Sequence, residues 1–282
     1  MHEKWFGFRP DPDQIHMKKQ WFTIQRVHPR IYAIAEFHHF EQVVSYLLVG
    51  DEEAVLFDTG MGYADIKAVV ETITALPVRV YLTHAHWDHI GGAHLFSSVS
   101  LFDSPFERNL LNAGFDSQAI PELMDRSLFK APFTPRTYRV PQFESYTILR
   151  ANVHIPCDPF TLVLVHTPGH TPGSVCYFVP ELSVLFTGDT VYPGPLYAQL
   201  PESNTSDYAQ SVRTLCRDFS AASLILPGHN AVSASVDMLI SAEQLFSFIY
   251  AGKKDHIKQQ FFEKSVDKRM SVLLPDGKQI RR

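Results

Sequence analysis

One histidine-rich segment, which directly follows a predicted strand, constrains this chain more than any other feature. Residues 83–89 read THAHWDH and bring three imidazoles and one carboxylate into six positions. The β-branched and aromatic residues of 78–82 indicate a buried strand, and the IGGA sequence of 90–93 indicates a turn that enters a helix. Imidazole and carboxylate groups are joint ligands of zinc and iron, and α/β sheets place their sites at the carboxyl ends of strands. The segment therefore predicts a metal site; the alternative is an exposed polar loop that is merely rich in His.

The composition is that of an ordinary soluble protein. The chain has 282 residues, which allows one large domain or two small ones, with 45% hydrophobic and 20% charged residues. A net charge of −5 gives no sign of nucleic-acid binding. The three cysteines, Cys157, Cys176 and Cys216, lack metal-ligand spacing and fit a reducing compartment. No apolar run has the length of a signal peptide's core at the start or of a membrane span elsewhere, so we expect a cytoplasmic protein without a membrane span.

The first part of the chain predicts strands followed by a βαβ unit. After an irregular arm at residues 1–20, short apolar or alternating runs are separated by turn residues, which indicates an antiparallel meander. Residues 66–76 place apolar side chains on one helical face, and Pro77 is expected to end that helix. The strand that leads into the histidine-rich segment completes the βαβ unit. The runs of the meander are residues 22–27, 31–35, 43–49 and 54–57.

The middle of the chain is less regular. Residues 107–113 and 121–129 have helical patterns, whereas residues 131–142 contain three prolines and predict a loop. We interpret residues 100–145 as an insertion over one face of the domain. Its Phe and Leu residues suit a lid or pocket wall, and simple packing against the core explains them equally well.

The second part again predicts strands that end in glycine-containing loops. A hairpin is expected at residues 174–186, and a helix is expected after Ser206 as its N-cap. Further expected elements are strands at 160–165 and 224–226, a helix at 235–250, and a hairpin formed by 271–274 and 279–281. We expect one domain over residues 21–252, with residues 253–282 packed on it as a basic extension.

Three more residues of ligand type follow predicted strands. His170, Asp189 and His229 each stand next to a glycine, which lets the backbone approach closely where a Cβ would clash. Alone, His170 or His229 would be read as an ordinary turn histidine. Together with residues 84–89, these three side chains complete a specific metal-binding pattern.

These motifs resemble those of the metallo-β-lactamase superfamily, in the hydrolase branch that includes glyoxalase II and the acyl-homoserine lactonases. The resemblance covers roughly residues 20–250 and rests on motifs at 84–89, 168–170, 187–189 and 227–229, with a further match at 58–60. A narrower resemblance, to metallo-β-lactamase-domain acyl-coenzyme A thioesterases, runs through residues 186–192, 206–208 and 226–229. The resemblance implies an α/β (α+β) fold of the αββα type, in which two mixed sheets are flanked by helices.

The resemblance also implies a site with two divalent metal ions. Zinc is the default for this donor set, and iron and manganese are chemically allowed. The ions would hold a bridging hydroxide that attacks a carbonyl carbon. The resemblance implies the following ligands: His84, His86 and His170 for the first ion, Asp88, His89 and His229 for the second, and Asp189 as a bridge between them.

Other residues receive roles from the same resemblance. Asp88 would orient the hydroxide and carry its proton to the leaving group, and Asp58 would orient the histidine loop through hydrogen bonds. Tyr192 would hydrogen-bond the substrate carbonyl, as a tyrosine at that step does in the lactonases; a packed tyrosine with a satisfied hydroxyl is the alternative.

The predicted function is hydrolysis of a small-molecule ester, most of all a thioester of coenzyme A or glutathione. A lactonase of the acyl-homoserine lactone type is one alternative, and a mononuclear iron dioxygenase acting on persulfides is another. Residues 253–282 carry nine Lys/Arg against four Asp/Glu. Lys253 and Lys254 could therefore form a cationic rim for an anionic substrate, or simply a solvated helix face. The sequence leaves the oligomeric state open, a homodimer included.

Overall fold

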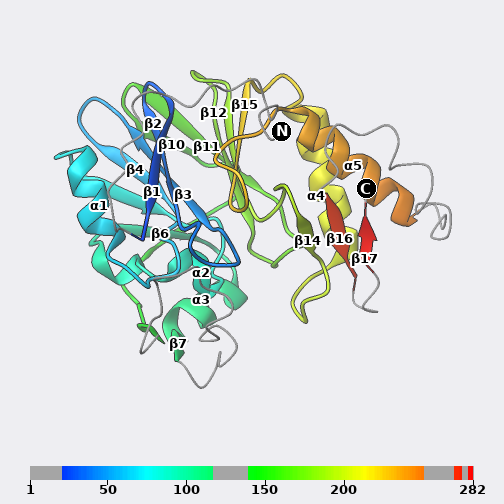
Figure 1. Cartoon of the computed structure of the whole chain (residues 1–282), viewed down its shortest axis with the longest axis horizontal. Helices are drawn as coiled ribbons and strands as arrows, with labels where there is room; N and C mark the ends of the chain where they lie inside the picture. Colours follow the sequence, from blue (N-terminus) through cyan, green and yellow to red (C-terminus); the bar gives the residue numbers. More distant parts are fainter. Residues whose placement is uncertain (1–20, 117–138, 251–269, 275–278, 282) are drawn as a thin grey trace.

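The computed structural model describes residues 21–116, 139–250, 270–274 and 279–281 (Figure 1). Two mixed sheets lie between two groups of helices, with α1, α2 and α3 on one side and α4 and α5 on the other (Figure 1). This arrangement confirms the αββα sandwich expected from the sequence.

The first sheet has seven strands in the order β1-β2-β3-β4-β5-β6-β9. Its first four strands form the expected antiparallel meander, and β4, β5, β6 and β9 run parallel to one another. The switch occurs because α1 (Ile66–Ile73) carries the chain from β4 back to the start of β5, as in the expected βαβ unit. The strands are β1 (Thr23–His28), β2 (Ile31–Ala35), β3 (Val44–Val49), β4 (Ala54–Phe57), β5 (Val78–Tyr81), β6 (Val99–Phe102) and β9 (Thr147–Leu149).

The second sheet has five strands in the order β10-β11-β12-β13-β15. The first four pair antiparallel, and β15 joins β13 in parallel after the crossover through α4 (Thr205–Asp218). The strands are β10 (His154–Cys157), β11 (Phe160–His166), β12 (Val175–Val179), β13 (Val184–Gly188) and β15 (Leu224–Pro227).

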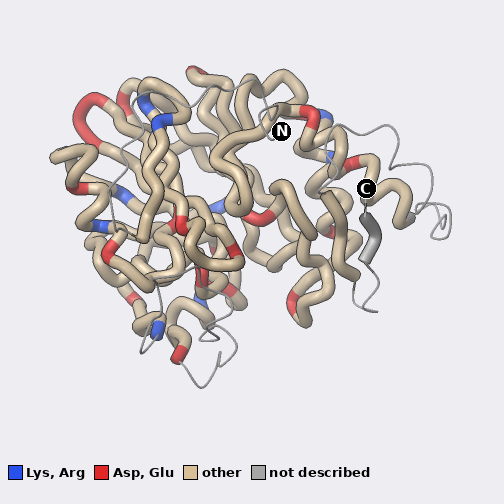
Figure 2. Tube along the Cα trace, viewed as in Figure 1, with Lys and Arg blue, Asp and Glu red and all other residues tan. Residues whose placement is uncertain are grey.

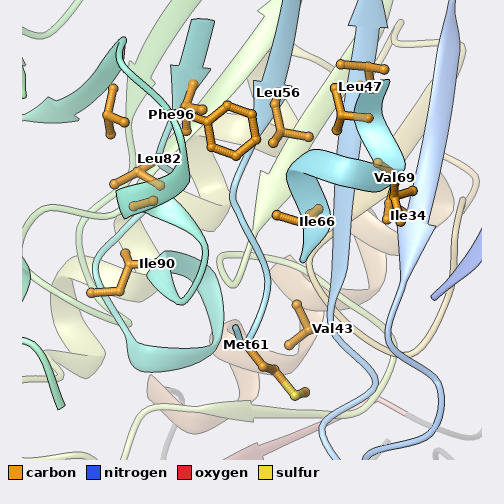
Figure 3. Packing of buried hydrophobic residues seen from close by; sticks show 14 of the residues in the cluster. Ile34, Val43, Leu47, Leu56, Met61, Ile66, Val69, Leu82, Ile90 and Phe96 are labelled. Atoms are coloured by element: carbon orange, nitrogen blue, oxygen red, sulfur yellow. The ribbon is translucent and has the colours of Figure 1, made fainter. Parts of the chain in front are cut away.

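Three apolar clusters hold these layers together. The cluster between the two sheets includes Phe57, Tyr177 and Phe186, and the rings of Phe57 and Phe186 stack with centroids 3.9 Å apart. A second cluster packs α1 and the loops near α2 (Trp87–Ile90) onto the outer face of the first sheet (Figure 3). A third packs α4 and α5 (Asp237–Tyr250) onto the second sheet. Successive side chains of a strand point to opposite faces of its sheet, so each sheet contributes apolar residues to two of these clusters.

Two small sheets complete the described structure. β7 (Phe115–Asp116) pairs with β8 (Arg139–Val140) after α3 (Pro105–Ala113). β14 (Pro195–Tyr197) pairs in parallel with β16 (Ser271–Leu273), which pairs antiparallel with β17 (Gln279–Arg281). The expected C-terminal hairpin therefore forms, and its strand β16 pairs with β14 in a separate three-stranded sheet.

Several local expectations differ from the structure. Residues 100–102 lie in β6, inside the first sheet, rather than in an insertion over its face. The helix expected to run to residue 76 ends at Ile73, and a helix begins at Trp87 within the histidine-rich segment instead of after it. The N-cap of α4 is Asn204 and not Ser206, because the Asn204 side chain accepts hydrogen bonds from two backbone N–H groups of the first turn.

Some expectations fall on residues that the structure does not describe. They are the arm at residues 1–20, the helix expected at 121–129, most of the loop expected at 131–142, and most of the basic extension expected at 253–282, including Lys253 and Lys254. Along the described trace, both basic and acidic residues are scattered over the molecule (Figure 2). None of the described helices combines the length and apolar character that a bilayer span requires.

Candidate metal centre

Four loops at one edge of the sandwich bring together the seven side chains that the sequence singles out. One loop follows β5 in the first sheet, and the other three follow β11, β13 and β15 in the second sheet. The ligand-type atoms fall into overlapping groups of three in which all atoms lie within 4.8 Å of one another. The residues in these groups are His84, His86, Asp88, His89, His170, Asp189 and His229.

The first group, called the first half-site below, consists of His84, His86 and His170. The Nδ1 atom of His86 lies 3.1 Å from His84 Nε2 and 2.9 Å from His170 Nε2. The three ring nitrogens therefore converge on one point between the two sheets.

The second group, called the second half-site below, consists of Asp88, His89 and His229. The Nε2 atoms of His89 and His229 lie 3.2 Å apart. The Asp88 Oδ2 atom lies 3.9 Å from the first of these nitrogens and 3.7 Å from the second. One carboxylate oxygen and two imidazole nitrogens thus face one another.

Asp189 lies between the two half-sites. Its Oδ2 atom is 3.0 Å from His229 Nε2 and 3.5 Å from His170 Nε2, and its Oδ1 atom is 3.2 Å from His89 Nε2. This carboxylate contacts rings of both groups, as a bridging ligand would. Gly228 permits the approach, since a Cβ there would lie 2.7 Å from Asp189 Oδ1.

Hydrogen bonds fix the orientation of the histidine rings of the first half-site. His170 Nδ1 lies 2.9 Å from the Tyr197 carbonyl oxygen, which can only accept, and His86 Nε2 lies 2.8 Å from a carboxylate oxygen of Glu202. His84 Nδ1 lies 3.0 Å from the hydroxyl oxygen of Thr83. Each outer nitrogen therefore holds the ring proton, and the inner nitrogens present lone pairs to one another.

Asp58 orients the second half-site and also the start of the histidine loop. Its Oδ1 atom accepts from the Thr83 backbone N–H at 2.7 Å. Its Oδ2 atom accepts from the Thr83 hydroxyl at 2.8 Å and from His89 Nδ1 at 2.8 Å. Since the Thr83 hydroxyl gives its proton to Asp58, its oxygen is left to accept from His84. The fifth ring, His229, donates from Nδ1 to the Glu41 carbonyl oxygen at 2.7 Å.

The arrangement fits a bound cation. Five imidazoles direct their inner nitrogens toward one another, and two such nitrogens about 3 Å apart cannot hydrogen-bond without a proton or a metal ion between them. Among the described residues, Asp189 Oδ1 is buried and meets no donor in hydrogen-bonding geometry. A divalent ion in each half-site would satisfy these atoms, and nitrogen and carboxylate donors suit zinc, iron or manganese.

Without a metal, protons take its place in the second half-site. Burial opposes the charge on His229, but Asp189 and Asp88 raise its pKa to about 9. Burial likewise opposes a raised pKa at His89, yet Asp189, Asp88 and Asp58 hold it well above its usual value. Burial would raise the pKa of Asp189, but His229 and His89 lower it well below its ordinary range.

The first half-site behaves in the opposite way. Burial, with a further contribution from His86, lowers the pKa of His170 to about 4. Burial and the neighbouring His89 also hold the pKa of His84 well below its usual value. These rings stay neutral, and therefore ready to bind a metal, at physiological pH.

Tyr192 lies at the second half-site but its hydroxyl is engaged. Its ring centroid is 5.1 Å from that of His229, and its hydroxyl donates to the Pro195 carbonyl oxygen at 2.6 Å. A role as donor to a substrate carbonyl would require this hydrogen bond to break.

The sequence reasoning missed two acidic residues at the centre, Glu202 and Glu107. Glu202 accepts from the outer nitrogen of His86, and Glu107 is a fully buried carboxylate between the loops of the first half-site. Nothing in the sequence near Glu202 marks it as a partner of a histidine far away in the chain. Glu107 carries a signal of another kind, because it stands in a helix-capping motif with Ser104.

The comparisons with known proteins agree with the geometry. The sequence profile described as "Metallo-beta-lactamase superfamily" matches residues 39–229. The chain is 28% identical over 229 residues to the acyl-coenzyme A thioesterase MBLAC2 of Bos taurus, covering 74% of this chain and 81% of that protein. It is 24% identical over 203 residues to the hydroxyacylglutathione hydrolase GloC of Haemophilus influenzae, covering 68% of this chain and 87% of that protein.

A solved structure shows the same fold. A metallo-beta-lactamase family protein of Thermus thermophilus superposes with a TM-score of 0.60 at 23% sequence identity. The match covers 80% of this chain and 81% of that one.

Proposed function

Because this chain belongs to the metallo-beta-lactamase superfamily, we propose that it is a metal-dependent hydrolase with two divalent ions that cleaves thioesters. The substrate class is an acyl thioester of coenzyme A or of glutathione. The observation that carries the proposal is the convergence of seven ligand-type side chains, with Asp189 between the two half-sites.

The half-sites divide the ligands between the two ions. The first ion would be held by His84, His86 and His170, and the second by Asp88, His89 and His229, with Asp189 shared by both. When bound, zinc ions supply a nucleophile derived from water at neutral pH and polarise a carbonyl oxygen. The remaining chemistry falls to the side chains of this chain.

Asp88 is the group best placed to handle the proton of the reaction. It is a buried carboxylate whose Oδ2 atom faces the nitrogens of His89 and His229. In the proposed reaction this carboxylate orients the attacking water, takes its proton and passes it to the leaving thiolate. A positioned general base of this kind contributes about 10²–10⁴-fold to a rate.

The choice of a thioester is supported by the relatives. The Bos taurus protein is named as an acyl-coenzyme A thioesterase and the Haemophilus influenzae protein as a hydroxyacylglutathione hydrolase, and each names a thioester substrate. Two such relatives, each matching about 70% of this chain, favour the thioester over the lactone.

The test is a substrate panel on purified protein with its metal content measured. Acyl-coenzyme A esters, a 2-hydroxyacyl glutathione thioester and an acyl-homoserine lactone are compared by thiol release or by acid release. We expect two metal ions per chain, thiol release from at least one thioester, and little activity on the lactone. Asp88→Asn should lower kcat by about 10²–10⁴-fold while His84, His86 and His170 keep the first ion.

The matched control is Asp218→Asn. Asp218 is an exposed aspartate that pairs with its neighbour Arg217 on α4, so the same chemical change there should leave kcat unaltered. Full activity in protein stripped of metal by a chelator would refute the proposal. One iron per chain together with oxygen uptake on glutathione persulfide would show a dioxygenase instead.

A further inference from the structure

A helix-capping sequence near the metal centre does not cap its helix. Ser104 and Glu107 have the Ser-x-x-Glu spacing of a capping box at the start of α3. In a capping box the serine hydroxyl accepts from the backbone N–H three residues on, and the glutamate reaches back to the serine N–H. Here the Ser104 side chain makes no capping bond, and within the described residues its buried hydroxyl has no hydrogen-bond partner.

The glutamate of this motif is committed to the metal centre. One carboxylate oxygen of Glu107 accepts from the Ala85 backbone N–H at 2.7 Å. The other accepts from the Thr171 hydroxyl at 2.6 Å and from the Gly173 backbone N–H at 3.0 Å. Glu107 has no exposed surface, so these three donors, and not bulk water, satisfy its carboxylate.

The three donors belong to the two loops that carry the first half-site. Ala85 stands between His84 and His86, and Thr171 directly follows His170. A single carboxylate therefore joins a loop of the first sheet to a loop of the second. The second loop is shaped for this contact, because a Cβ on Gly173 would overlap the Cγ atom of Glu107.

Burial of the Glu107 carboxylate between the two loops costs free energy, which a solvent-exposed capping glutamate would not lose. Burial raises the pKa of Glu107, whereas the hydrogen bond from Thr171 opposes that rise. A buried charge is tolerated only when it is well hydrogen-bonded, and a lost cap usually destabilises a helix. Local rules of this kind are broken chiefly at functional sites.

We propose that Glu107 is a positioning residue for the first metal ion: by bridging the Ala85 and Thr171 loops, it sets the spacing of the His84, His86 and His170 rings. The inference rests on the proposed function, since it takes the first half-site to hold an ion. Glu107 would thus position ligands of the first ion, as Asp58 orients His89 at the second half-site, with one difference. Asp58 touches a ligand ring directly, whereas Glu107 acts only through the backbone and hydroxyl groups beside the ligands.

The central variant is Glu107→Gln, which keeps the size of the side chain. An amide has one acceptor oxygen in place of two. If that oxygen serves Thr171 and Gly173, the amide NH₂ group meets the Ala85 N–H, and two donors face each other. The segment that carries His84 and His86 then loses its anchor. Loss of such an outer partner typically weakens metal binding 10–100-fold.

The experiment is a zinc competition titration of the full-length protein against a chromophoric chelator, which gives one dissociation constant for each ion. Spectra of the cobalt-substituted protein identify which half-site is filled. His86→Ala and His229→Ala serve as references for loss of the first and the second half-site. Thermal unfolding and circular dichroism show that each variant is folded.

We expect Glu107→Gln to weaken binding of the first ion about 10–100-fold and to leave the second dissociation constant unchanged. Thr171→Val removes one of the three donors at nearly constant volume and should have a smaller effect of the same kind. Ser104→Ala is the matched control from the same motif and should change neither constant. If Glu107→Gln does not fold, Thr171→Val alone tests the link.

Two results would overturn the inference. One is an unchanged first dissociation constant in folded Glu107→Gln or Thr171→Val, and the other is equal weakening of both ions. The proposed function fails in a different way, through a wild-type protein that binds fewer than two ions or cleaves no thioester. If the wild-type protein binds two ions and cleaves a thioester, but folded Glu107→Gln binds the first ion with unchanged affinity, the inference about Glu107 fails and the proposed function stands.

Discussion

Asp58→Asn offers the sharpest test of how the second half-site is built. Asp58 is buried and accepts three hydrogen bonds, two from Thr83 and one from His89 Nδ1, at 2.7–2.8 Å. Asparagine has the same shape but replaces one carboxylate oxygen by an NH₂ group. If the NH₂ group faces His89, the ring must accept at Nδ1 and carry its proton at Nε2, where the metal should bind. If it faces Thr83, it meets the backbone N–H.

The expected effect follows from this geometry. Either orientation leaves one buried donor unpaired or places the His89 proton on the wrong nitrogen. An unsatisfied buried group costs roughly 1–3 kcal/mol, and loss of a ligand's outer partner weakens metal binding about 10–100-fold. We therefore expect the second ion to bind about 10–100-fold more weakly and the metal-free protein to lose roughly 1–3 kcal/mol of unfolding free energy.

Two measurements check this prediction. Zinc competition titration reports each dissociation constant, and urea unfolding of the metal-free protein reports the free energy of unfolding. Thr83→Val separates the contributions: it keeps Asp58 against His89 and removes the hydroxyl that also accepts from His84 Nδ1, so any weakening should appear at the first ion. A second ion bound with wild-type affinity in Asp58→Asn would refute the argument from the His89 proton. Selective loss of the first ion would refute it as well.

Three further predictions concern the same centre. Because the pKa of His229 is raised to about 9 and that of His89 also lies well above its usual value, a metal must displace protons from both rings, so affinity for the second ion should fall at least tenfold per unit as pH drops from 8 to 6. His170, with its pKa lowered to about 4, needs no such displacement, and zinc titrations at pH 6, 7 and 8 should show a shallower change for the first ion. Tyr192→Phe should cost about 1 kcal/mol in urea unfolding, through the lost bond to Pro195, and leave kcat near wild type; a fall of about 10²-fold would instead support donation to the substrate. Gly169→Ala should lower the free energy of unfolding by roughly 1–3 kcal/mol, because Gly169 has a φ of +145° and a Cβ there would overlap the backbone of α4; an unchanged urea midpoint would contradict this.

The sequence predicted the long strands and the ligand cluster because both leave strong local patterns. Alternating or continuous apolar runs marked the meander and the strands of the second sheet. The short strands β6, β9, β10 and β14 were missed. Two of them, β10 and β14, contain a proline, which ordinarily argues against a strand. β6 lies at the start of the region interpreted as an insertion, and β9 directly follows that region. Their strand form depends on partners that the local sequence does not show.

The partners behind the ligands could be predicted only in part. Asp58 stood in a recognisable motif, and the structure places it against His89. The acceptors of His170 and His229 are backbone carbonyl oxygens, of Tyr197 and Glu41, and such groups are the same in every residue. Only tertiary structure decides which carbonyl faces a ring, so sequence patterns carry no information about these contacts.

The division of the ligands between the sheets would give the proposed metal ions a structural role. Each half-site takes ligands from both sheets, since the histidine-rich loop follows β5 whereas His170, Asp189 and His229 follow strands of the second sheet. The sheets are already joined near the centre by direct hydrogen bonds, among them one from the Val175 N–H to the Thr83 carbonyl oxygen at 2.9 Å. We therefore expect the ligands to move little when a metal ion binds. An ion that binds only the folded chain increases the free energy of unfolding. If little of its binding free energy is used to order the loops, most of it adds to the stability of the whole sandwich.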